Sequence, residues 1–168
     1  MKRRAFLVAI LMVCAVIAVH AVAFNPFGYA ESVRDSGAII DVGVGYGWAF
    51  DIHATFDKLF PIAAGSNTLP LSFGGNVDVA FGGLGFGFSV DARALWHVDL
   101  GIPELDLYAG PSLGFWGYHL DLLDEFYPGF DYGGVAGARW AFSKSMAAFF
   151  ETGYTGLTYA KAGITFIL

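Results

Sequence analysis

Beyond its first two dozen residues this sequence has no long hydrophobic run, although 56% of the chain is hydrophobic. No uninterrupted apolar segment after Phe24 reaches the length of about 20 residues that a membrane-spanning helix needs. Charged residues are scarce as well, at 14% of the chain, and the mean hydropathy of +0.57 is high for a soluble protein. These values indicate a membrane protein whose hydrophobic residues are distributed in some other way than in helices.

Cysteine and histidine are nearly absent. Cys14 is the only cysteine and lies in the N-terminal leader, so the predicted mature chain has no disulfide or thiol chemistry. Three histidines remain after the leader, and no His/Cys spacing matches a metal site, so we predict neither metal nor cofactor. His119, with Asp121 or Asp124 beside it, is the best candidate for a catalytic base, but no serine nucleophile is evidently placed next to it. The sequence therefore predicts a protein that is not an enzyme.

The N-terminus has the pattern of a secretory signal peptide. Lys2, Arg3 and Arg4 precede an apolar run over residues 5–19, and the small-residue motif Ala21-Val22-Ala23 follows. We expect cleavage between Ala23 and Phe24. A retained anchor helix is disfavoured because the run is short, and a lipoprotein is disfavoured because Val13 is not small.

Cleavage would leave residues 24–168 as a single domain with a net negative charge. Removal of three of the nine Lys and Arg residues leaves six against fifteen Asp and Glu, a net charge of −9. We therefore expect no binding to nucleic acid.

Hydrophobic residues alternate with small or charged ones along the remaining chain. In residues 84–99 (LGFGFSVDARALWHVD) the even positions are apolar, whereas the odd positions include Asp91, Arg93, His97 and Asp99. Because successive side chains of a strand point to opposite faces, this pattern predicts a strand with one apolar and one polar face. The same pattern recurs in eight segments, over residues 38–50, 52–57, 69–81, 84–99, 105–118, 130–142, 146–154 and 159–168.

The segments predict an all-β fold, an eight-stranded antiparallel transmembrane β-barrel of up-and-down meander topology. A sheet that crosses a bilayer must close, since every backbone polar group has to be paired within the protein. The apolar face would then contact lipid and the charged face would line the interior. The first outer turn is expected near residues 48–52; the alternative is that 38–57 form one strand and the missing partner lies in 24–33. A soluble, lipocalin-like barrel would have the opposite orientation, but the charged face is too rich in glycine to solubilise it.

The connections suit a barrel that inserts from the periplasm. Residues 101–104 and 143–145 predict short periplasmic turns, and 61–68 a longer periplasmic connection. Gly82-Gly83 and Gly156-Leu157 predict tight outer turns, and 119–129 the longest outer loop. Aromatic residues at the strand ends predict girdles at the two membrane surfaces; these residues are Tyr46, Trp48, Trp96, Trp140 and Tyr154.

Three segments resemble the small porin-like outer-membrane β-barrel family of the eight-stranded OmpA/OmpX type: LDLYAGPSLGFWGY (105–118), GGVAGARWAFSKSMAAFFETGY (133–154) and YAKAGITFIL (159–168). ARALWHVDL (92–100) and AFNPFGYAESV (23–33) resemble spirochaete members. The resemblance spans essentially the whole mature chain and implies the fold and an outer-membrane location. The chain departs from barrels that end on an aromatic residue, because it ends Phe166-Ile167-Leu168.

Inward charges and an acidic outer loop are the candidate functional features. The predicted lumen network consists of Asp41, Asp57, Asp91, Arg93, Asp106, Arg139, Glu151 and Lys161. We interpret it as a structural ion-pair network, with a narrow, cation-preferring pathway as the functional alternative. Eight strands leave an interior that side chains nearly fill, although inward glycines are expected to leave room for water.

The expected function is an integral outer-membrane protein with a structural or narrow porin-like role. The alternative is adhesion or ligand binding through the loop at 119–129; its candidate contact residues are Asp121, Asp124, Glu125, Phe126 and Tyr127. The expected partners are membrane lipids, the outer-membrane assembly machinery and, through the loop, a host or envelope protein. The sequence names no solute, receptor or oligomeric state.

Overall fold

The computed structural model describes residues 24–82, 85–155 and 157–168, and the predicted signal peptide lies outside them. Of the predicted cleavage site only Phe24 is described. Within the described residues no helix is long and apolar enough to cross a membrane.

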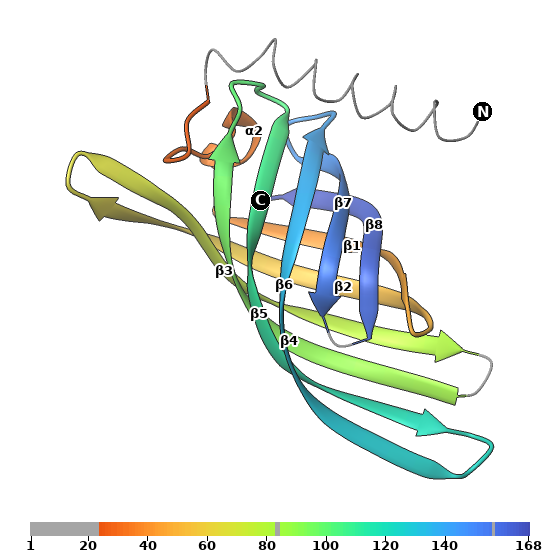
Figure 1. The fold of residues 1–168 in the computed structure, drawn as a ribbon. Helices are drawn as coiled ribbons and strands as arrows, with labels where there is room; N and C mark the ends of the chain where they lie inside the picture. The colour runs from red at the N-terminus through yellow and green to blue at the C-terminus, as the bar shows by residue number, and fades with distance from the viewer. Residues whose placement is uncertain (1–23, 83–84, 156) are drawn as a thin grey trace, which may run out of the picture.

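Eight antiparallel strands form a closed barrel in which each strand pairs with its neighbours in sequence (Figure 1). The strands are β1 (Ala38–Gly47), β2 (Phe50–Ala64), β3 (Asn67–Gly82), β4 (Gly85–Asp99), β5 (Leu105–Leu120), β6 (Glu125–Ala141), β7 (Met146–Thr155) and β8 (Thr158–Ile167). β1 closes the barrel against β8, with Val42 opposite Ile164 and Gly43 opposite Gly163. The predicted all-β, eight-stranded antiparallel meander is confirmed.

The first strand connection lies between β1 and β2, at Trp48 and Ala49, within the interval of 48–52 that the sequence favoured for the first turn. Residues 24–33 do not supply a barrel strand: apart from one bridge between Asn25 and Asp99, they lead into the short helix α2 (Glu31–Arg34). We call the end of the barrel that carries α2 and Leu168 the terminal end, and the opposite end the far end.

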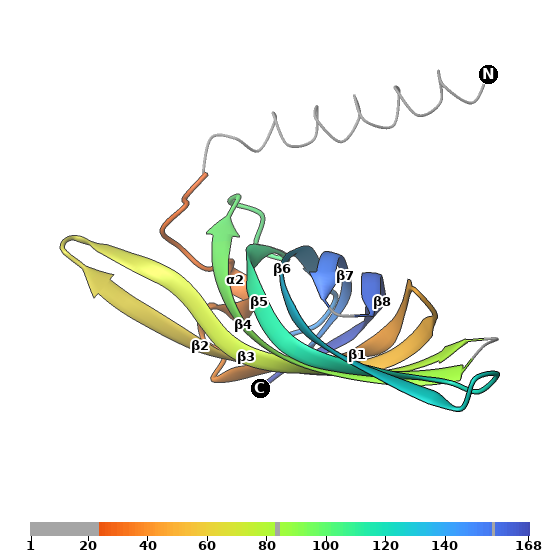
Figure 2. The same cartoon turned by 60° about the horizontal axis from the view of Figure 1, so that its bottom comes forward.

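Two predicted connections are wrong because strands continue through them. β2 and β3 pair as far as Ala64 and Asn67, which places a projecting hairpin where a loop was expected at 61–68 (Figure 2). Pro61 and Pro70 face each other in this hairpin, beyond the last residues of β2 and β3 that pair with β1 and β4. Proline is tolerated there because its missing N–H faces no neighbouring strand.

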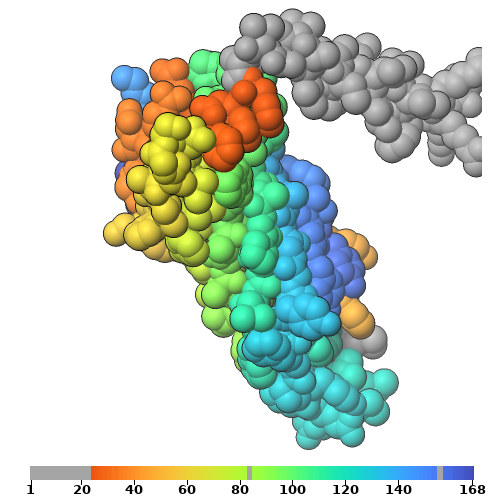
Figure 3. Space-filling view, turned by 60° about the vertical axis from the view of Figure 1, so that its left-hand side comes forward, coloured from red at the N-terminus to blue at the C-terminus, as the bar shows by residue number. Residues whose placement is uncertain are grey.

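The predicted outer loop at 119–129 is likewise mostly strand. Leu120 pairs with Glu125, so the connection is reduced to residues 121–124. Asp124 adopts a positive φ of 52° in this turn, a conformation that aspartate tolerates better than most residues. The β5–β6 hairpin projects at the far end, where its teal and blue surface forms the tip of the molecule in Figure 3.

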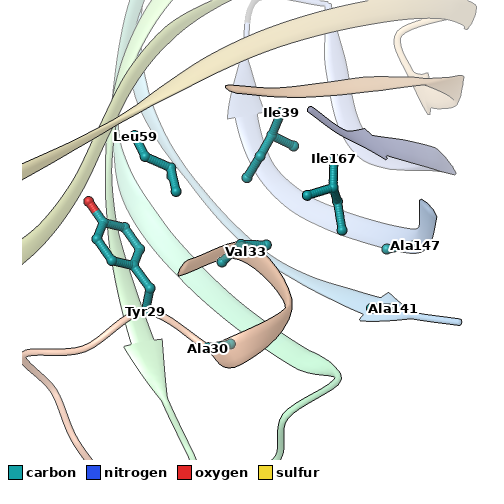
Figure 4. Packing of buried hydrophobic residues seen from close by; sticks show 8 residues of the cluster. All are labelled: Tyr29, Ala30, Val33, Ile39, Leu59, Ala141, Ala147 and Ile167. Carbon is teal, nitrogen blue, oxygen red and sulfur yellow. The ribbon is translucent and has the colours of Figure 1, made fainter. Parts of the chain in front are cut away.

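Residues of the N-terminal segment close the terminal end. Ala30 and Val33 are buried, and Figure 4 shows Tyr29 and Val33 directed toward barrel residues such as Leu59 and Ile167. The Tyr29 hydroxyl donates a hydrogen bond to the carbonyl oxygen of Leu71. Burial raises the pKa of Tyr29, which keeps this donor protonated. The segment is therefore packed into the barrel mouth rather than lying loosely outside it.

Barrel closure is testable with cysteines at paired positions. In a chain carrying Cys14→Ser, we expect Val42→Cys and Ile164→Cys to form a disulfide on mild oxidation. Directly opposed residues on antiparallel strands have Cα atoms about 4.5–5.5 Å apart, within the range of disulfides. The cross-link is measured by gel mobility of the dilute monomer. The matched control is Val42→Cys with Val90→Cys on β4, and equal cross-linking in both variants would contradict the closure.

Candidate functional site

The barrel interior holds nearly all the charged side chains of the strands. The side chains at odd-numbered positions of β4 point inward, and so do the side chains of the residues paired with them on the neighbouring strands, as the alternation of side chains along a strand requires. Within the described residues, eight carboxylates and three cationic Lys or Arg side chains are buried. They are Asp41, Asp51, Asp57, Asp78, Asp91, Asp106, Asp131, Glu151, Arg93, Arg139 and Lys161.

Arg93 on β4 is the first of two arginines at the centre of this interior. Its guanidinium pairs with both carboxylate oxygens of Asp57; the Nε–Oδ1 distance is 2.8 Å. Its Nη1 donates to Glu151 Oε2 at 2.9 Å. Such two-point pairing matches the planar guanidinium to the carboxylate and gives the strongest kind of protein hydrogen bond.

Arg139 on β6 is the second arginine at the centre of the interior. Its Nε and Nη2 donate to Asp41 at 3.1 and 2.7 Å, and Nη1 donates to Asp106 at 3.1 Å. Its Nη2 also donates to Asp57 at 2.9 Å. Because Arg93 Nη2 also lies 3.4 Å from Asp41 Oδ2, both Asp41 and Asp57 join the two arginines. The Tyr108 ring lies beneath the guanidinium, 4.0 Å from ring centre to Cζ, an arrangement that adds cation–π attraction. We call this set the central network: Asp41, Asp57, Arg93, Asp106, Arg139 and Glu151.

Hydroxyl and imidazole side chains extend the central network to the two strands that contribute none of its members, β3 and β8. Thr165 on β8 donates to Asp41 at 2.6 Å, and Tyr108 on β5 donates to Glu151 at 3.1 Å. His97 Nδ1 lies 2.8 Å from Asp106 Oδ1, and its Nε2 lies 3.0 Å from Ser72 Oγ on β3. The network therefore links all eight strands across the interior.

Six of the eight predicted network residues belong to the central network. The other two, Asp91 and Lys161, lie in a separate cluster nearer the far end. There Lys161 Nζ lies 2.8 Å from Asp78 Oδ1 and donates to Asn76 at 2.9 Å. Ser89 donates to Asp78 at 2.6 Å and to Asp91 at 3.2 Å.

Sequence reasoning missed Asp51, Asn76 and Asp78 as members of the interior. The signal was present for Asp78, because it alternates with the apolar residues Val77 and Val79. Asp51 was missed because it falls in the interval assigned to the first turn. Strand β2 instead begins at Phe50, which places Asp51 on the same face as His53.

Three of the inward glycines, Gly45, Gly87 and Gly137, accommodate neighbouring side chains, so the prediction that they leave room for water is corrected at these positions. A Cβ on Gly137 would lie 2.4 Å from the Tyr108 ring, and one on Gly45 would lie 2.5 Å from the Asp51 carboxylate. A Cβ on Gly87 would meet Tyr118 and Leu157 at 2.6 and 2.8 Å. Glycine therefore allows large side chains to cross over the adjacent strand and fill the barrel.

The predicted contact residues of the outer loop lie on the β5–β6 hairpin. Asp121 and Asp124 occupy its turn, whereas Glu125, Phe126 and Tyr127 belong to β6. All five are exposed, and the Tyr127 hydroxyl donates to Glu125. His119 Nε2 lies 3.7 Å from a carboxylate oxygen of both Asp121 and Asp124.

The predicted aromatic girdle residues divide into two groups. Tyr46, Trp48, Trp140 and Tyr154 are exposed near strand ends. Trp96 instead donates through Nε1 to the Pro26 carbonyl oxygen at 2.8 Å and so helps to attach the N-terminal segment.

Comparison with protein-family models finds no match, and comparison with curated proteins finds no relative. What the chain does is therefore argued below from the barrel and its interior.

Loss of one arginine from the central network should strongly destabilise the barrel. Arg139→Met leaves Asp41 and Asp106 buried without their main cation, and breaking a buried pair in this way costs about 3–5 kcal/mol. The free energy of unfolding is measured by urea titration of the folded barrel.

The matched control is Arg34→Met, because Arg34 has 54% of its side chain exposed and lies 3.6 Å from Asp99. Exposed pairs contribute about 1 kcal/mol or less. Equal losses in the two variants would show that the central network does not carry the stability assigned to it.

Proposed function

We propose that this chain is an integral outer-membrane β-barrel, exported by the signal at residues 1–23, whose side-chain-filled interior gives it a structural role with at most narrow conduction. The observation that carries the proposal is the distribution of side chains on a closed sheet: apolar residues face outward and ionisable residues face inward. This distribution suits a hydrocarbon surrounding, because the bilayer core offers no hydrogen bonds to polar groups.

The outward face is apolar on every strand. Exposed residues such as Ile52, Val90 and Leu113 have more than half of their surface accessible. Between the strand ends Lys58 is the one charged side chain on the outward face of the described barrel. It pairs with Ala38, the first residue of β1, and so lies near the terminal end, where a membrane surface would allow its ammonium group to reach water. A lipocalin-like barrel would have the reverse distribution.

The contents of the interior favour a structural role over a wide pore. The terminal end is closed by Tyr29, Ala30 and Val33, and the central network crosses the barrel behind them, since the Tyr29 and His97 rings are 5.3 Å apart. The excess of buried carboxylates over Lys and Arg would favour cations in any residual pathway. We therefore propose narrow, cation-preferring conduction at most.

A second candidate function, partner binding through the β5–β6 hairpin, is favoured by the exposed residues at its tip. Leu122 and Leu123 are 83% and 58% exposed beside the charged Asp121 and Asp124. Apolar groups exposed next to charges on a projecting element suit recognition of another protein.

Membrane insertion is tested by labels at two outward positions. A fluorophore on Val90→Cys should be quenched by spin-labelled lipid chains in vesicles, because Val90 lies in the middle of β4. The same fluorophore on Leu122→Cys at the hairpin tip should be quenched by a water-soluble quencher instead. Quenching of both labels from the aqueous phase alone would contradict insertion, as would failure of the unboiled protein to migrate differently from the boiled protein on a gel.

Conduction is tested in planar bilayers with purified monomer. The closed terminal end and the central network lead us to expect only small or unstable current steps. Arg139→Met should increase the current, because it removes the guanidinium group that joins Asp41, Asp57 and Asp106 across the lumen. Large, stable pores from the unaltered protein would contradict the proposed interior.

A further inference from the structure

We infer that Asp51, His53 and Asp78 form a binding site for one divalent transition-metal ion inside the barrel, with Zn²⁺ as its probe. The sequence predicted no metal site, because these ligands come from two strands and no motif spacing joins them. The inference concerns the folded barrel and goes beyond its proposed role in the membrane.

The three side chains converge because of strand register. Asp51 and His53 lie two residues apart on β2 and share its inward face, and Asp78 on β3 lies directly opposite His53. Each offers one ligand atom, and these atoms lie within 4.8 Å of one another. Two ligands bonded at about 2.1 Å to one ion are at most about 4.2 Å apart, so small side-chain adjustments would bring all three into contact with it.

His53 lacks the hydrogen bonds that a buried imidazole requires. It is 98% buried, and neither ring nitrogen has a hydrogen-bond partner among the residues that the structure describes. Asp51 Oδ1 lies 3.4 Å from Nδ1, and within the described residues it too has no hydrogen bond. The Phe149 ring packs edge-on against the imidazole, with centroids 5.6 Å apart. An unsatisfied polar group in such surroundings is costly, and a metal ion would satisfy His53 and Asp51 together.

The charged residues in this part of the interior also favour a bound cation. Three carboxylates are buried in this part of the described barrel: Asp51, Asp78 and Asp91. The one ammonium group buried with them belongs to Lys161, which pairs with Asp78. Arg93 and Arg139 are already engaged by the carboxylates of the central network. Carboxylate groups thus outnumber ammonium groups by two in this cluster, and one divalent ion would balance them.

The ligands are held by groups behind them, as in established metal sites. Thr158 donates to Asp51 Oδ2 at 2.8 Å, which leaves Oδ1 directed at His53. Asn76 and Ser89 both donate to Asp78 Oδ2. The other carboxylate oxygen, Asp78 Oδ1, pairs with Lys161 and would also be the ligand of the ion. One imidazole nitrogen with two carboxylates suits ions such as Zn²⁺ better than Ca²⁺ or Mg²⁺, which prefer oxygen ligands alone.

The test is metal content and stability after refolding. The purified protein is unfolded in urea with a chelator, refolded with or without Zn²⁺, dialysed and analysed for bound metal. We expect one Zn²⁺ per chain and a higher unfolding midpoint in its presence. His53→Gln and Asp51→Asn should each weaken binding by at least about 10-fold and abolish the shift in midpoint. A gel comparison of boiled and unboiled samples establishes that each variant folds.

The matched control is His119→Gln, because His119 lies near two exposed carboxylates and could hold Zn²⁺ at the surface. We expect this variant to bind Zn²⁺ as the unaltered protein does. Absence of bound Zn²⁺ in the unaltered protein would overturn the inference. Loss of binding in His119→Gln but not in His53→Gln would overturn it in favour of the surface site.

Discussion

The structure depends on the compensation of buried charge inside a closed sheet. Eleven charged side chains are buried in the described barrel, and each would be expensive without a partner. Arg93 and Arg139 pair with most of the carboxylates of the central network, because each guanidinium can donate hydrogen bonds to several carboxylates at once. The barrel cannot change register by one residue without turning these groups outward, so the network that fills the interior also fixes the alignment of the strands.

The same constraint orders the interior along the barrel axis. The N-terminal segment closes the terminal end, and the central network lies next to it through the contact between Tyr29 and His97. The Asp78–Lys161 cluster and the candidate metal site follow. At the far end Trp116 and Tyr118 pack on Ala49, Ala80 and Leu157. Side chains thus occupy successive layers along the axis of the described barrel, which supports the proposed structural role over a wide channel.

The number of strands, their order and the direction in which their side chains point could be predicted from the sequence, because the alternation of apolar and polar residues persists through every strand. Arg93 and Arg139 are buried on the face that alternation assigned to them. Strand ends could not be predicted. In a projecting hairpin such as the one around Pro61 the two strands pair with each other, and water can hydrogen-bond the remaining backbone groups, so no alternating apolar pattern is needed. Which inward side chains contact one another across the lumen could not be predicted from the sequence either. Alternation says that Asp51 and Asp78 are on a polar face, but only the register of β2 against β3 brings them together.

The central claim is tested most directly by nuclear Overhauser contacts between methyl groups and lipid chains, recorded on the refolded protein in nanodiscs. Val44 and Ile164 point outward and should show contacts to acyl-chain protons, whereas Leu95, which is fully buried among interior residues, should show none. Acyl-chain contacts from Leu95, or water contacts alone from Val44 and Ile164, would contradict a barrel with its apolar face to lipid and its charges within.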